Sequence, residues 1–137
     1  MKIQFSQKRF KGTEIARQVH ALICSCVTSK YRQGLLVKVM FYTDPELKTY
    51  WRGNYRDIYH HGLYDNEWDM KGVESVMTLK VGPEVPRDKL LYLIAHETGH
   101  HIIRSQDRRG GEKKADKIAS QIIARVNKKK KENDVPQ

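Results

Sequence analysis

The segment 86–104 constrains the fold of this chain most, because it predicts a long helix that carries two histidines one turn apart. Pro86 lies at the start of the predicted helix, where proline is favoured, and Asp88 lies near the positive end of the helix dipole. The body of the helix, LLYLIAHETGHHII, is mostly apolar. A chain of 137 residues is long enough to surround such a helix with one hydrophobic core.

Hydrophobic periodicity predicts the other elements. Apolar residues spaced three and four apart favour a helix, and alternation of apolar and polar residues favours a strand. Helices are expected over 13–30, with Thr13 as N-cap, and over 112–126; strands are expected over 35–43 and 73–81, and short strands with one hairpin over 42–68. The sequence therefore predicts an α+β fold with an N-terminal helix and a small, mostly antiparallel sheet of three to four strands.

The charge of the chain is concentrated at its two ends. Residues 1–34 have seven Lys or Arg against one acidic residue, residues 104–137 have eleven against five, and residues 35–103 have eight against ten. The basic ends permit an acidic partner such as nucleic acid, although solubilising termini are the simpler interpretation. We expect one domain over 1–127, followed by a basic, disordered tail over 128–137.

Sequence features also argue against several classes of protein. There is no apolar run of 18 residues and no secretory signal, so we expect a cytoplasmic protein without a membrane partner. Cys24 and Cys26 are too close for a disulfide framework and lack the spacing of a cysteine zinc site. We expect both thiols to be reduced.

The motif that carries chemistry is HETGH, residues 96–100. His96 and His100, at positions i and i+4, lie on one face of the predicted helix and can bind one metal ion. Glu97, between them, can act as a general base on a water molecule held by that metal. His101 points about 100° away from His100, so we do not expect it to be a ligand.

A catalytic zinc site needs a third protein ligand and one open position. The metzincin pattern would place a third histidine six residues after His100, but position 106 is Gln and no histidine follows His101. The candidates downstream are therefore Asp107, Glu112 and Asp116. Glu112 stands out because it continues the apolar stripe of the 112–126 helix, where an unpaired carboxylate would be costly. Asp116, one turn later, could accept a hydrogen bond from a ligand histidine, and it is the alternative third ligand.

HETGH followed by EKKADKIASQII resembles the gluzincin metallopeptidases, which combine HExxH with ExxxD, and is similar to the HtpX-type and ImmA/IrrE-type peptidases. The resemblance implies a minimal zincin-like domain with an active-site helix and a C-terminal ligand helix. It implies one zinc ion per chain bound by His96, His100 and Glu112. It assigns the general base to Glu97 and a supporting hydrogen bond to Asp116.

The sequence also offers candidates for holding a peptide substrate. If the 73–81 strand is the edge of the sheet, its backbone at Met77, Thr78 and Leu79 could pair with an extended peptide. The resemblance further suggests an oxyanion-stabilising tyrosine or histidine, for which the candidates are Tyr59, His60, His61 and Tyr64.

We therefore expect a zinc-dependent endopeptidase that acts on a peptide or protein. The alternative is a non-catalytic or regulatory zinc-binding module whose basic termini bind an acidic partner, either nucleic acid or a DNA-bound repressor. A latent enzyme blocked by its own terminus is a third interpretation. The presence of Glu97 favours the endopeptidase over the non-catalytic module, since a structural zinc site has no use for a carboxylate between its ligands.

Overall fold

Three α-helices and four β-strands form the part of the chain that the computed structural model describes, residues 1–42, 44–57, 71–103 and 111–134. In chain order they are β1 (Lys2–Phe5), α1 (Glu14–Cys26), β2 (Leu35–Phe41), β3 (Trp51–Asp57), β4 (Ser75–Val81), α3 (Arg87–Ile103) and α4 (Gly111–Asp134). Short 3₁₀ turns occupy Lys8–Phe10, Ser29–Tyr31 and Pro45–Leu47. None of the described helices has the length and apolar character needed to cross a membrane. The α+β class is confirmed.

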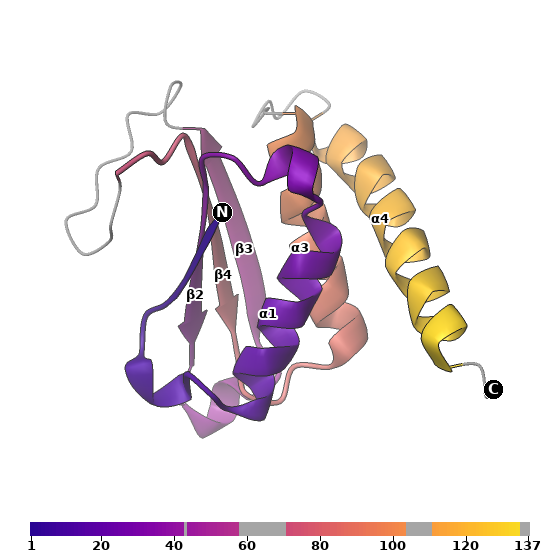
Figure 1. The fold of residues 1–137 in the computed structure, drawn as a ribbon. Coiled ribbons are helices and arrows are strands. Elements are labelled where there is room, and N and C mark those ends of the chain that lie inside the picture. Colours follow the sequence, from indigo (N-terminus) through magenta and orange to yellow (C-terminus); the bar gives the residue numbers. More distant parts are fainter. Residues whose placement is uncertain (43, 58–70, 104–110, 135–137) are drawn as a thin grey trace.

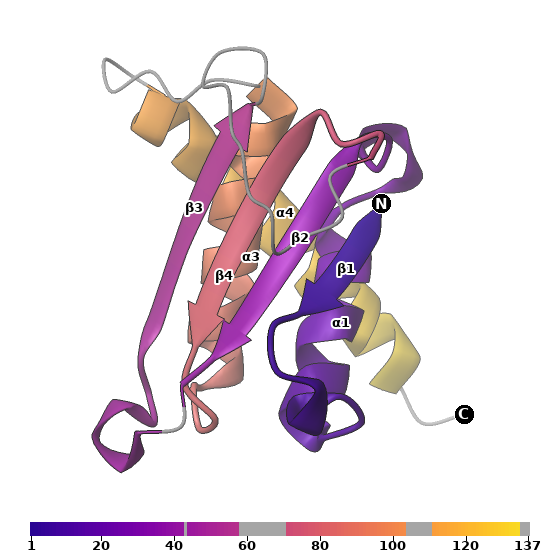
Figure 2. The same cartoon turned by 90° about the vertical axis from the view of Figure 1, so that its left-hand side faces the viewer.

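The four strands form one mixed sheet in the order β1-β2-β4-β3, as Figure 2 shows. β1 and β4 both run parallel to β2, and β3 is antiparallel to β4. The prediction of a mostly antiparallel sheet was therefore wrong. Helix α1 provides the crossover that a parallel β1–β2 pair requires, and the four residues of β1 are too few to reveal a strand by alternation.

The helices lie on one face of the sheet in two successive layers (Figure 1). Helices α1 and α3 pack against the sheet, and α4 lies on the far side of α3 from the strands. Helix α3 is therefore covered on two sides, which agrees with its mostly apolar sequence. Its buried residues are Leu90, Leu91, Leu93, Ile94, Ala95, Glu97, Thr98, Gly99, His100 and His101.

The core lies between the sheet and the α1–α3 layer. In β4 the alternation predicted from sequence is confirmed, since Met77, Leu79 and Val81 are fully buried on the helix side. Helix α1 begins where predicted, with the Thr13 hydroxyl accepting a hydrogen bond from the amide of Ala16 at 3.3 Å.

Helix α4 packs through the predicted stripe but is longer than predicted. Ala115, Ala119, Ile122 and Val126 are buried along one side. The helix continues to Asp134, so residues 128–134 are helical where we expected a disordered tail. Lysine is a good helix former, and adding residues to an existing helix is easier than nucleating one.

Candidate metal centre

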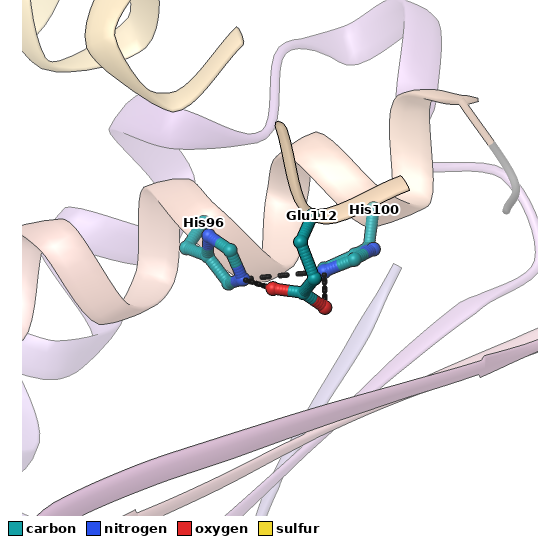
Figure 3. Close-up of side chains that lie close together, drawn as sticks. All are labelled: His96, His100 and Glu112. Carbon is teal, nitrogen blue, oxygen red and sulfur yellow. Dashed lines mark hydrogen bonds and ion pairs between the residues drawn. The ribbon is translucent and has the colours of Figure 1, made fainter. Parts of the chain in front are cut away.

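The two motif histidines lie on the side of α3 that faces α4. His96 and His100 project from successive turns of α3, and Glu112 comes from the first turn of α4 (Figure 3). Their side chains are 14%, 8% and 65% exposed, so His100 is buried, His96 is partly buried and Glu112 is open to solvent. A carboxylate in the first turn is also favoured by the helix dipole.

The donor atoms of these three residues converge on one point. The Nε2 atoms of His96 and His100 are 3.2 Å apart, and each lies 3.0 Å from an oxygen of Glu112. All the ligand atoms of the group lie within 4.8 Å of one another. The structure thus brings together the three residues that the sequence singled out, and the group could hold a metal ion.

The spacing of the donors suits zinc. Two ligands about 2.1 Å from a shared tetrahedral ion lie roughly 3.4 Å apart, close to the separations in this cluster. Two histidines and one carboxylate are also the donor set of many catalytic zinc sites, which keep a fourth position for water or substrate. The residues present therefore fit a zinc ion.

Asp116 orients His96 from the other side of the ring. Its Oδ1 accepts a hydrogen bond from Nδ1 of His96 at 2.8 Å. With the proton held on Nδ1, the lone pair of Nε2 points toward Glu112 and His100. Glu112, whose carboxylate lies beside both Nε2 atoms, could therefore serve as the third donor, and Asp116 lies in the supporting position predicted for it.

Tyr92 is part of the site and was not predicted. Its hydroxyl donates a hydrogen bond to Oδ1 of Asp116 at 3.0 Å, and its ring stacks on His96 with centroids 5.8 Å apart. Burial and this hydrogen bond raise the pKa of Tyr92. The signal was available in the sequence, because residues 92, 96 and 100 fall on one face of a helix.

Glu97 lies in the narrow space between α3 and β3. Its side chain is only 6% exposed, and burial raises its pKa to about 7, with Glu112 adding to the rise and His100 opposing it. A carboxyl group that titrates near neutrality is suited to accept and return a proton. Gly53 of β3 makes this position possible, since a Cβ there would lie 2.8 Å from Cγ of Glu97.

Gly99 sets the distance between the two ligand-bearing helices. A Cβ added to Gly99 would lie 2.6 Å from the backbone oxygen of Ala115 in α4. Ala115 itself is fully buried. The small residues at this crossing let α4 approach the motif helix closely, and that approach brings Glu112 within reach of the histidines.

The prediction of peptide binding on β4 assumed that this strand is an edge of the sheet, and that assumption was wrong. Met77, Thr78 and Leu79 lie in a strand that pairs with β2 on one side and β3 on the other, so their backbone is used within the sheet. Alternation showed which residues of the strand face the core, but it cannot show which strands are neighbours. The outer strand next to α3 is β3.

His101 has a structural role, in agreement with its predicted direction. It is 1% exposed, and its Nε2 donates a hydrogen bond to the carbonyl oxygen of Tyr31 at 2.6 Å. Its Nδ1 lies 3.2 Å from the hydroxyl of Tyr55 and 3.3 Å from that of Ser75. These contacts join α3 to the sheet and to the segment after α1.

Several predicted candidates fall outside the described residues. The oxyanion candidates Tyr59, His60, His61 and Tyr64 lie within 58–70, and Asp107 lies within 104–110. Their roles stay predictions.

Comparisons with protein-family models, curated proteins and solved structures found no match to this chain.

Proposed function

We propose that this protein is a zinc-dependent endopeptidase of the minimal gluzincin type, with a zincin-like domain. The observation that carries the proposal is the convergence of His96, His100 and Glu112 beside the buried Glu97. A structural zinc site would be closed by a fourth protein ligand, whereas the described residues offer this group three donors, one of them an exposed carboxylate. The proposed location is the cytoplasm.

The residues of the site divide the work of peptide hydrolysis. When bound, zinc would polarise the substrate carbonyl and make water more acidic. Glu97 accepts a proton from the attacking water at its carboxylate and returns it to the leaving amine. Asp116 keeps the proton of His96 on Nδ1, and Tyr92 holds Asp116 in place.

The substrate would lie along β3 rather than β4. β3 is the outer strand of the described sheet on the side of the site, and its Gly53 packs against Glu97. An extended peptide added to this edge would therefore pass beside the general base. Main-chain hydrogen bonds would supply much of the affinity, so we expect broad side-chain tolerance.

The first test is metal content, measured by mass spectrometry on protein purified without added metal. We expect about one zinc per wild-type chain and much less in Glu112→Ala. Glu132→Ala is a matched control, because it removes an exposed carboxylate from the far end of the same helix. Wild-type protein that binds no zinc even when zinc is offered would refute the site.

The second test separates catalysis from metal binding. Glu97→Gln should keep its zinc but lower kcat/KM on a cleaved peptide library by about 10²-fold or more, because the proton acceptor is lost. Equal cleavage by wild type and Glu97→Gln would contradict the mechanism. Zinc binding without any peptide cleavage would favour the non-catalytic binding module.

A further inference from the structure

The sheet face opposite the helices carries a second candidate binding site, independent of the proposed peptidase function. Figure 2 looks onto this face, with β4 and β2 at its centre. A cavity of about 430 Å³ opens there, within the range of sites for small molecules. Polar side chains of three strands and the segment before β3 line it: Lys38, Tyr50, Arg52, Asn54, Thr78 and Lys80.

Strand register places the cations of this cavity side by side. Lys80 pairs directly with Arg52 across the antiparallel β3–β4 ladder, and Thr78 lies between Lys38 and Asn54 in the adjacent row. Because Leu79 faces the helices, both Thr78 and Lys80 face the cavity. The described lining residues thus contribute three cations and no carboxylate.

The Arg52–Lys80 pair is unfavourable without a counter-charge. The Cβ atoms of directly opposed residues in an antiparallel pair are about 5 Å apart, and two side chains of like charge in such a pair repel each other. Arg52 is exposed and Lys80 partly exposed, so both are accessible to a ligand. An anion between the two side chains would turn the repulsion into attraction.

The donors favour a phosphate group over a single carboxylate. The Arg52 guanidinium offers a fork of N–H donors that matches two phosphate oxygens, and Lys80 adds a point charge. The hydroxyl of Thr78 and the amide of Asn54 can supply neutral hydrogen bonds in the next row. The adjacent cations Arg52 and Lys80 suit a group with more than one negative charge.

We propose that this cavity binds the phosphate groups of a phosphorylated ligand between Arg52 and Lys80, with Lys38, Thr78 and Asn54 around them. The ligand could be a small molecule or a segment of nucleic acid, since both present the same phosphate chemistry. The cavity volume favours the small molecule.

Isothermal titration of the full chain with inorganic pyrophosphate, at fixed ionic strength, tests the proposal. We expect saturable binding that weakens about 10-fold in Arg52→Gln and in Lys80→Gln. The double variant Lys128→Gln/Lys131→Gln, on the exposed end of α4, loses more charge and should bind as wild type does. Glu112→Ala should also bind normally, which excludes pyrophosphate held by metal at the His96 site.

A short single-stranded oligonucleotide distinguishes the source of the phosphate. If the oligonucleotide binds, pyrophosphate does not, and Arg52→Gln abolishes that binding, the site is supported as a nucleic-acid site. If neither pyrophosphate nor the oligonucleotide binds saturably, the proposal is overturned. Equal weakening in the Lys128→Gln/Lys131→Gln control also overturns it, because the effect would then be one of net charge.

Thermal unfolding provides a readout that guards against misfolded variants. Arg52→Gln and Lys80→Gln each remove one of two repelling charges, so neither should melt below the wild type. Pyrophosphate should raise the melting temperature of the wild type more than that of the variants at the same concentration. An equal rise in all three proteins would place the ligand elsewhere and overturn the proposal.

Discussion

Gly99→Ala tests whether the close approach of α3 and α4 controls the candidate metal centre. The new Cβ would lie 2.6 Å from the backbone oxygen of Ala115 and 3.0 Å from its Cα. Both atoms belong to the backbone of α4, so no side chain can rotate away. The two helices must separate by a few tenths of an ångström.

The stability change is the difference between two opposing effects. Alanine is favoured over glycine inside a helix by about 1 kcal/mol. Overpacking of a tight contact costs about 1–3 kcal/mol. We expect the free energy of unfolding to fall by about 1 kcal/mol, measured by urea denaturation followed by circular dichroism in the presence of a chelator, with an unchanged m-value.

The same separation should weaken zinc binding. Glu112 is attached to the moving helix, whereas His96 and His100 remain on α3, so their 3.0 Å contacts lengthen together. We expect zinc affinity, measured by competition with a chromogenic chelator, to fall by about 10-fold or more, as when ligand orientation is disturbed. A variant more stable than wild type, with unchanged zinc affinity, would refute the close contact.

Three other features can be tested by single substitutions or reagents. Asp116→Asn should weaken zinc binding about 10-fold through the lost charge beside the ligand histidine, and unchanged affinity in the chelator assay would contradict that role. Burial raises the pKa of Cys26 to about 12, so a thiol reagent at pH 8 should label Cys24 first; equal rates would contradict the buried position. Arg32→Ala removes two hydrogen bonds to carbonyls at the end of α1 and should cost about 1–2 kcal/mol of unfolding free energy by urea denaturation, whereas Lys128→Ala should cost none.

The elements near the site could be predicted because their patterns are local. Histidines at i and i+4 must share a helix face, and the stripe that ends at Glu112 points that residue toward the packed side of its helix. The structure places His96, His100 and Glu112 together accordingly. Tyr92 was missed although the same spacing includes it.

The arrangement of the strands could not be predicted, because neighbours in a sheet are chosen by contacts between distant segments. Alternation in residues 75–81 identified the buried side of β4 and still left open whether it was an edge. The error bears on the proposed function, since the sequence analysis placed the peptide along β4, whereas the strand order leads the proposal to place it along β3.

Counting charges along the chain did not reveal the cationic face of the sheet, for the same reason. Residues 35–103 have more acidic than basic residues, so the middle of the chain gave no sign of an anion site. The pleat of three strands places Lys38, Arg52 and Lys80 on one face, away from the helices. A cationic surface is a property of register, which a running sum of charges does not contain.

The candidate metal centre and the packing of α4 both depend on the close approach of α3 and α4. Helix α4 lies outside the α1–α3 layer. Ile122 and Val126 are buried further along it, and its buried residues nearest the candidate metal centre are the small Ala115 and Ala119. These residues bury little apolar area, and their value lies in letting the backbones approach. An ion shared by α3 and α4 would bridge the helices where apolar packing is thinnest. It would add about 2.7 kcal/mol of stability when free metal is at 100 times its dissociation constant. Ligand geometry and the attachment of α4 are therefore coupled, so that a change in either must affect the other.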